Sequence, residues 1–323
     1  MTTLRCLPLA LATLASVAAF AAESTYPTRP IRLIVGYPPG GATDIAARLV
    51  GQKLAPVFGQ TIVIDNRAGA SGTIAATLVA SAEPDGHTLS FAASPEAAIY
   101  RALMKKPPYD SLKDFQPATL VGRVPFMLVV HPSVGASTVK ALVALAKAKP
   151  GTMNFASFGS GTSNHLVGEA FRAATGIEIV HVPYKGSAPA LADLLGGQVQ
   201  MTFDAVPVVL PQVKAGKLKA LAVATVKRSA LAPGVPTMDE SGVPGFVGGT
   251  WFGVLAPART PAAIVDRLSR EIGMVLRASD VAQTFNERGI EPVGNTPAEF
   301  RAFIESETRR WLKVAQDAGV KPE

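Results

Sequence analysis

A glycine-rich segment near the start of the chain carries the residue types expected of an anion-binding site. Gly40–Asp44 follows the apolar run 31–36 and comes directly before residues with helical spacing. The N–H groups in the first turn of a helix have no partner within that helix, and the helix dipole adds partial positive charge there. A carboxylate or another anion is therefore a natural ligand. A tight turn, with Thr43 or Asp44 capping the helix, is the alternative.

A second glycine- and hydroxyl-rich segment, Ser157–Ser163, occupies the same kind of position later in the chain, after the apolar stretch 153–157 and before a helical pattern. In open α/β sheets such strand-to-helix junctions lie at the carboxyl ends of the strands, where ligands bind. Two such loops facing each other across a cleft could hold a carboxylate through backbone amides and hydroxyls, without an arginine.

A dinucleotide site is the first competing interpretation, because Asp65 ends the second predicted strand where a ribose-binding acid would lie. The segment Gly36–Gly41 does not have the spacing G-x-G-x-x-G, however. Pro38 and Pro39 also remove two amide donors where phosphates would need them. The sequence therefore predicts no nucleotide cofactor.

A serine hydrolase and a metal centre are the other two competing interpretations. The chain has no G-x-S-x-G motif, and Ser163 and His165 are two apart on one predicted helix, so they do not face each other. The four histidines, which are His87, His131, His165 and His181, are dispersed and show no close zinc-type pair. We therefore expect no metal, no cofactor and no catalysis.

Strands and helices that alternate along the chain must position the two loops. Apolar runs predict strands over 31–36, 61–65, 87–93, 126–130, 153–157, 177–182, 199–204, 218–224 and 251–255. Helical spacing is found around 45–54, over 71–82, 139–148 and 163–174, from Ser187 onward, and over 261–278, 281–288 and 297–318. This order predicts an α/β fold of mixed, largely parallel sheets flanked by helices.

The alternation restarts after residue 125, which predicts two lobes of similar build. Residues 126–246 would form a second lobe inserted into the first, and 23–125 together with 247–323 would form the first lobe. The glycine- and proline-rich stretch 232–249 is the expected return connection. Such a crossing would leave a cleft between the lobes.

The start of the chain has the features of a signal peptide over residues 1–22. Arg5 precedes the uncharged apolar run 7–20, and Ala19–Ala21 offers a small-x-small cleavage pattern, so we expect cleavage near Ala21/Ala22 and export to the periplasm. The run is shorter than the roughly 20 apolar residues that a membrane span needs. The net charge of +7 is scattered and aromatic residues make up only 7%, so we expect no nucleic-acid partner.

From about Tyr26 to the C-terminus the chain resembles the Bug receptors, the extracytoplasmic solute-binding components of tripartite tricarboxylate transporters. The resemblance rests on several short motifs in a fixed order: Tyr26-Pro-Thr-Arg-Pro30, Tyr37-Pro-Pro-Gly-Gly-Ala-Thr-Asp44, Asp65-Asn-Arg-Ala-Gly69, Glu83-Pro-Asp-Gly86, the Gly161–His165 loop, Val182-Pro-Tyr-Lys-Gly186 and Gly234-Val-Pro-Thr-Met-Asp-Glu240. It implies a two-lobe periplasmic-binding-protein fold, the Venus flytrap, that closes on a carboxylate.

The resemblance also implies a set of ligand-binding residues from both lobes. They are Tyr37, Gly41, Ala42, Thr43, Asp44 and Ser94 of the first lobe, and Ser157, Gly161, Thr162, Ser163, His165, Tyr184 and Asp204 of the second. Phe158 and Ser160 depart from the family pattern, in which small hydroxyl and polar amide residues are frequent, and they favour a more apolar pocket.

The partners implied by the resemblance are a small carboxylate and the inner-membrane subunits of a transporter. The carboxylate would be an organic acid, an amino acid or an aromatic carboxylate, and the receptor would act as a monomer. Delivery to a sensor kinase domain and an enzymatic reaction on a carboxylate are the alternatives. An acidic group at Asp204 would pair with an amino group of the ligand or cap the end of a strand.

Overall fold

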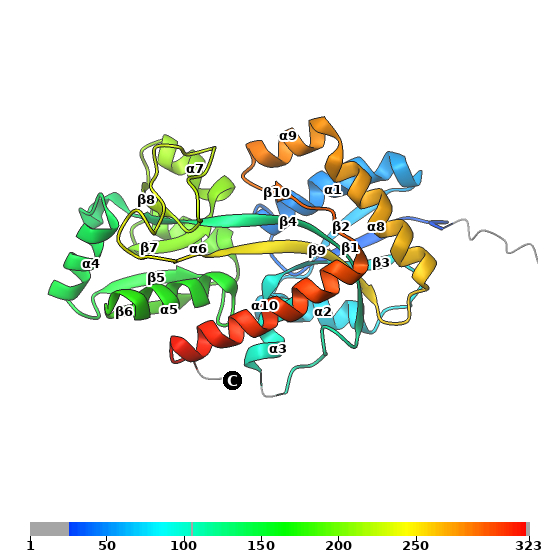
Figure 1. Cartoon of the computed structure of the whole chain (residues 1–323), viewed down its shortest axis with the longest axis horizontal. Helices are drawn as coiled ribbons and strands as arrows, with labels where there is room; N and C mark the ends of the chain where they lie inside the picture. The colour runs from blue at the N-terminus through cyan, green and yellow to red at the C-terminus, as the bar shows by residue number, and fades with distance from the viewer. Residues whose placement is uncertain (1–25, 105, 321–323) are drawn as a thin grey trace, which may run out of the picture.

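The computed structural model describes residues 26–104 and 106–320. The predicted signal peptide over residues 1–22 and its cleavage site lie outside the described residues. Within the described ranges, no helix combines the length and apolar character that a membrane crossing requires. The chain forms two lobes that lie side by side (Figure 1).

Three parallel strands form the centre of the first lobe. In space the order is β2-β1-β3, and each strand is followed along the chain by a helix, so that the helix N-termini gather at the carboxyl edge of the sheet. The elements are β1 (Ile31–Val35), α1 (Ala42–Phe58), β2 (Ile62–Asn66), the 3₁₀ turn η1 (Ala70–Gly72), α2 (Thr73–Ala80), β3 (Thr88–Ala93), the π-helical turn η2 (Pro95–Ile99) and α3 (Tyr100–Leu103).

The second lobe repeats this arrangement with β7-β5-β6 as its parallel strands. Its elements are the 3₁₀ turn η3 (Pro132–Val134), α4 (Val139–Ala148), β5 (Met153–Ser157), α5 (Ser163–Thr175), β6 (Ile179–Pro183), α6 (Ser187–Leu195), β7 (Met201–Ala205), α7 (Val206–Lys214) and β8 (Lys219–Val223). Helix α5 ends at Gly176, whose left-handed φ of 62° suits glycine.

Two long antiparallel strands, β4 (Phe115–Val130) and β9 (Gly249–Pro257), connect the lobes. Strand β4 pairs with β9 through Pro125 and with β7 from Phe126 onward, so one continuous sheet runs through both lobes. Figure 1 shows these two strands running from one lobe to the other. Placing the lobe boundaries at residues 125/126 and 246/247 remains our proposal.

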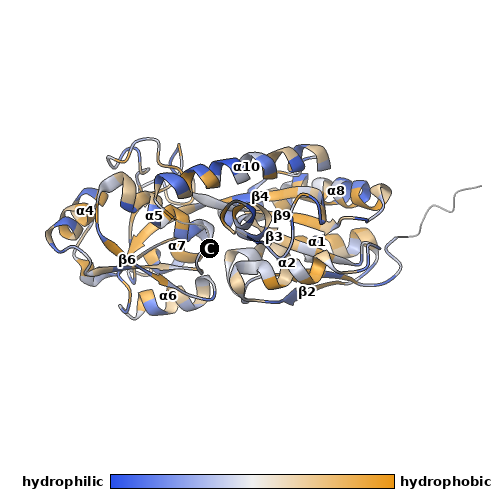
Figure 2. Cartoon of the chain, turned by 90° about the horizontal axis from the view of Figure 1, so that it is seen from below, coloured by the Kyte–Doolittle hydropathy of each residue, from blue (hydrophilic) through white to orange (hydrophobic). Residues whose placement is uncertain are grey.

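The C-terminal helices return to the first lobe, and the last of them also reaches the second. The elements are α8 (Ala262–Arg277), α9 (Ser279–Glu287), β10 (Glu291–Pro292) and α10 (Pro297–Asp317). Helix α10 packs Phe300 against β9 at Gly253, where a Cβ atom would lie 2.1 Å from the ring. Its far end contacts α5, and Figure 2 shows it lying along both lobes. The same view shows apolar residues concentrated on the strands and on the inner faces of the helices.

Several elements of the structure were not predicted from the sequence. The first half of β4, residues 115–125, was not predicted as a strand because Pro117, Gly122 and Pro125 interrupt it. The register of β4 against β9 shifts after Pro117 and before Gly122, so bulges accommodate these two interruptions. Helix α7 and the short turns η2 and α3 were also missed. In α7 the two prolines, Pro207 and Pro211, conceal the helical pattern.

Candidate functional site

A pocket lies between the lobes, at the carboxyl edges of both parallel strand sets. The cavity itself has a volume of about 30 Å³ in this conformation, room for about one or two water molecules. The residues that line it are Tyr37, Ala42, Thr43, Ala93, Pro95, Phe126, Phe158, Thr162, Ser163, Ser187, Asp204, Ala205 and Thr250.

Four helices begin at this pocket. Ala42 and Thr43 open α1, Ser163 opens α5, Ser187 opens α6, and Ala205 is the N-cap of α7. None of these four N-termini is capped by a side chain of its own N-cap residue. Their first-turn N–H groups and their dipoles therefore direct partial positive charge toward one small volume.

Asp204 is the acidic group of this pocket and is 1% exposed. Its Oδ2 accepts a hydrogen bond from the hydroxyl of Ser187 at 2.7 Å, and its Oδ1 accepts one from the backbone N–H of Ala205 at 2.6 Å. Burial raises the pKa of Asp204 to about 7. The carboxyl thus occupies the N-terminal ends of α6 and α7, and the N-termini of α1 and α5 are left for a ligand.

Two hydroxyl groups in the first turns of α1 and α5 are available to that ligand. The side chains of Thr43 and Ser163 are 8% and 3% exposed and line the pocket. Within the described part of the chain neither hydroxyl has a hydrogen-bond partner among protein atoms, although Thr162 beside them donates to the carbonyl of Gly159 at 2.6 Å. Neither oxygen is sealed inside the protein, so both can form hydrogen bonds with a molecule in the pocket.

The remaining predicted residues of the first lobe lie around the pocket without lining it. Gly41 is the N-cap of α1. Asp44 faces inward and accepts hydrogen bonds from Gly40, Arg48 and Asn66, which fixes the loop to β2. Ser94 is fully buried, and its hydroxyl bonds that of Thr250 at 3.0 Å.

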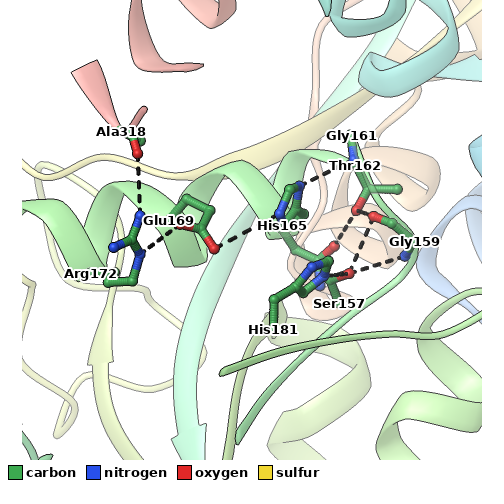
Figure 3. Close-up of polar contacts among 10 residues, drawn as sticks. Ser157, Gly159, Gly161, Thr162, His165, Glu169, Arg172, His181 and Ala318 are labelled. Atoms are coloured by element: carbon green, nitrogen blue, oxygen red, sulfur yellow. Dashed lines mark hydrogen bonds and ion pairs between the residues drawn. The ribbon is translucent and has the colours of Figure 1, made fainter. Parts of the chain in front are cut away.

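Of the predicted residues in the second lobe, Ser157, Gly161, His165 and Tyr184 lie outside the pocket lining. Ser157 ends β5 and His165 lies in the first turn of α5, and both form hydrogen bonds with the loop between them, as Figure 3 shows. Tyr184 faces a neighbouring groove, and its hydroxyl donates to Asp193 at 2.7 Å. Tyr37, Ala42, Thr43, Thr162, Ser163 and Asp204 are the predicted residues that the structure brings together at the pocket.

The apolar part of the pocket includes Phe158, one of the two departures from the family pattern. Its ring meets that of Phe126 edge to face, with centroids 6.4 Å apart. Phe126 belongs to β4 and Thr250 to β9. Neither was predicted to line a pocket, because the sequence does not distinguish strand residues that face a pocket from strand residues in the hydrophobic core. Ser187 could have been predicted as a pocket residue, because it opens a helix directly after the Val182–Gly186 motif.

Glu96 lies beneath the pocket and was also missed. It is 3% exposed, and its Oε2 accepts the hydroxyl of Tyr37 at 3.0 Å, while its Oε1 accepts the backbone N–H of Ala93 at 2.7 Å. Burial raises the pKa of Glu96 to about 7. Glu96 therefore holds two residues of the pocket wall in place.

The lobes touch each other directly beside the pocket. The hydroxyls of Ser71 and Tyr100, from the first lobe, both donate to the carbonyl of Ser160 in the second, at 3.1 and 3.2 Å. Gly159 has a φ of 130°, and a Cβ there would lie 2.6 Å from the Ser71 hydroxyl. The described conformation is thus a closed one.

Within residues 26–104 and 106–320, no group of three or more His, Cys, Asp or Glu side chains is arranged to hold a metal ion.

The raised pKa of Glu96 makes the stability of the protein depend on pH. In the unfolded chain Glu96 is protonated only below its ordinary pKa of 4.5, whereas in the folded protein it stays protonated up to about pH 7. The folded state binds more protons between those values, so this group lowers the free energy of unfolding as pH rises through them. Relative to the wild type, Glu96→Gln should gain about 1–3 kcal/mol of stability between about pH 4.5 and pH 7.5. Urea denaturation of both proteins at the two pH values measures their free energies of unfolding. If the difference between the variant and the wild type is the same at both pH values, the prediction is wrong.

Comparison with known proteins identifies the family. Residues 46–320 match the family described as the tripartite tricarboxylate transporter family receptor. The chain is 42% identical over 308 residues to protein BugT of Bordetella pertussis, covering 95% of this chain and 94% of that protein.

Two solved structures are similar along almost the whole chain. R. palustris Rpa4515 with adipate has a TM-score of 0.90 at 39% identity and covers 92% of this chain and 100% of that chain. MatC from Rhodopseudomonas palustris with bound malate has a TM-score of 0.85 at 32% identity, and the match covers 90% of this chain and 99% of MatC. The fold class predicted from the sequence is confirmed. The chain therefore belongs to the Bug (TctC) family of tripartite tricarboxylate transporter receptors, which are periplasmic solute-binding proteins and not enzymes, as the sequence predicted.

Proposed function

We propose that the protein captures a small carboxylate-bearing solute between its lobes and delivers it to the membrane subunits of a tripartite transporter. The carboxylate is held by the first-turn N–H groups of α1 and α5 and by the hydroxyls of Thr43 and Ser163. The predicted signal peptide, outside the described residues, would direct the chain to the periplasm, and the receptor would act as a monomer.

The observation that carries this proposal is the arrangement of the four helix N-termini. All four begin at the pocket, and no lysine or arginine is among the described residues that line it. Asp204 occupies two of the four positions as an internal hydrogen-bond acceptor. The two others, each with an unpaired hydroxyl, match the two oxygens of one carboxylate.

The rest of the pocket supports a particular kind of ligand body. Ala93, Pro95, Phe126 and Phe158 present apolar surface. Asp204, when ionised, would repel a second carboxylate placed next to it. Adipate and malate, found with Rpa4515 and MatC, are both dicarboxylates, so in this chain a second carboxylate would have to lie clear of Asp204.

A thermal-shift panel tests the proposed ligand class. The panel contains adipate, malate, amino acids and aromatic carboxylates, and each acid is paired with its carboxamide. A ligand that binds only the folded state stabilises it by about 2.7 kcal/mol at a hundredfold excess over Kd. We expect at least one acid to raise the melting temperature and its carboxamide to have little effect. Equal shifts from acid and carboxamide, or none from any acid, would contradict the proposal.

Removing either unpaired hydroxyl should weaken binding without unfolding the protein. Hydrogen bonds to charged groups contribute about 1.5–3 kcal/mol, so Ser163→Ala and Thr43→Val should each raise the Kd of the best acid by about 10- to 100-fold in calorimetry. Ser279→Ala is the matched control, because Ser279 also opens a helix, α9, but is exposed and does not line the pocket. Unchanged affinity in both pocket variants would show that the carboxylate binds elsewhere.

A further inference from the structure

Two histidines outside the pocket lining hold the loop that precedes α5. The backbone N–H of Gly161 donates to Nδ1 of His165 at 3.1 Å, and the hydroxyl of Ser157 is 2.5 Å from Nε2 of His181. Ser157 in turn accepts the N–H of Gly159 at 3.2 Å. Figure 3 shows the two imidazoles side by side behind the loop. Both ends of Ser157–Gly161 are therefore tied to imidazole nitrogens.

The two rings also form one packed unit. Their centroids are 4.0 Å apart with an interplanar angle of 25°, and the ring of Phe155 stacks on His181 at 5.0 Å. His165 is 8% exposed. Two protonated rings at this separation would repel each other strongly in so little solvent. In addition, Nδ1 of His165 accepts the Gly161 amide only when that nitrogen carries no proton. The Gly161 contact thus requires a neutral His165, and the stacking disfavours a positive charge on both rings at once.

We propose that His165 and His181 act as a stacked, neutral pair that positions the Ser157–Gly161 loop, and through it the N-terminus of α5, for ligand binding. This inference rests on the proposed function of that loop. It gives His165 a positioning role in place of the direct ligand contact expected from the sequence, and it adds His181, which had no expected role.

The charged groups around the pair are consistent with this role. Oε1 of Glu169 is 3.9 Å from Nε2 of His165, but Oε2 of the same carboxylate accepts from Nε of Arg172 at 2.7 Å, which largely compensates its charge. Arg172 also donates to the carbonyl of Ala318 just beyond α10. Figure 3 shows this chain of contacts from α10 to Gly161. The neighbouring strand β5 contributes Phe155, which is uncharged.

The protonation state of the pair follows from its burial. Burial lowers the pKa of His165 to about 4. Burial also lowers the pKa of His181 to about 4, with a further contribution from His165 that outweighs Glu169. Both rings are therefore neutral at the pH of most environments, and the Gly161 hydrogen bond is lost only as pH falls through about 4. A ligand carboxylate titrates in the same range, so the loop itself has to be observed without ligand.

The test is amide hydrogen exchange and ¹H–¹⁵N NMR of Gly161 in the ligand-free protein. His165→Phe keeps a stacking ring but removes the acceptor, and it should speed exchange of the Gly161 amide by roughly tenfold or more at pH 7. His165→Asn retains an acceptor near Nδ1 and should restore most of the protection. His131→Phe, on the far side of the second lobe, is the control. In the wild type the Gly161 amide shift should titrate near pH 4, and in His165→Asn this titration should be lost.

Binding of adipate and malate by the same variants completes the test. If the wild type binds either acid, His165→Phe should weaken that affinity by about tenfold while His165→Asn stays within about threefold of the wild type. If the wild type binds neither acid, that result bears on the ligand class of the proposed function, and the exchange data still decide the role of the pair. Unchanged Gly161 exchange in His165→Phe, or an amide shift that does not titrate, would overturn the inference.

Discussion

The convergence of four helix N-termini on one pocket is the physical constraint on which the rest of the structure depends. In each lobe a parallel βα order places the helix N-termini at the carboxyl edge of the sheet. The two connecting strands then bring these edges to face each other, as Figure 1 shows. Asp204 provides a hydrogen-bond acceptor at the N-terminal ends of α6 and α7. We propose that the N-terminal ends of α1 and α5 bind an anionic ligand at this pocket.

Buried acids and neutral imidazoles, in place of lysine or arginine, set the electrostatics around this pocket. Asp204 and Glu96 each accept hydrogen bonds from a backbone amide and a side-chain hydroxyl, and burial raises the pKa of both carboxyls to about 7. His165 and His181 stay neutral for the same reason. A site without fixed cations relies on backbone dipoles, which are held in place by the fold and need no reorganisation when a ligand binds.

The sequence allowed the fold class and the two strand–helix loops to be predicted, because hydrophobic periodicity and glycine placement are local signals. Thr43 and Ser163 were named as ligand-binding residues through the resemblance to the Bug receptors, and both lie in these loops. Phe126 and Thr250 could not be found in this way, since their place at the pocket depends on how β4 and β9 cross between the lobes. Glu96 and His181 were missed because no local sequence pattern marks a polar residue that supports others inside the fold. Its role depends on tertiary partners such as Tyr37 and Ser157.

A crystal structure with the tightest-binding acid of the panel tests the central claim most directly. The account predicts carboxylate oxygens about 2.7–3.2 Å from first-turn N–H groups of α1 and α5 and from the hydroxyls of Thr43 and Ser163. It also predicts that Asp204 keeps its hydrogen bonds to Ser187 and Ala205. A carboxylate bound instead to a lysine or arginine side chain, or outside the pocket between the lobes, would contradict it.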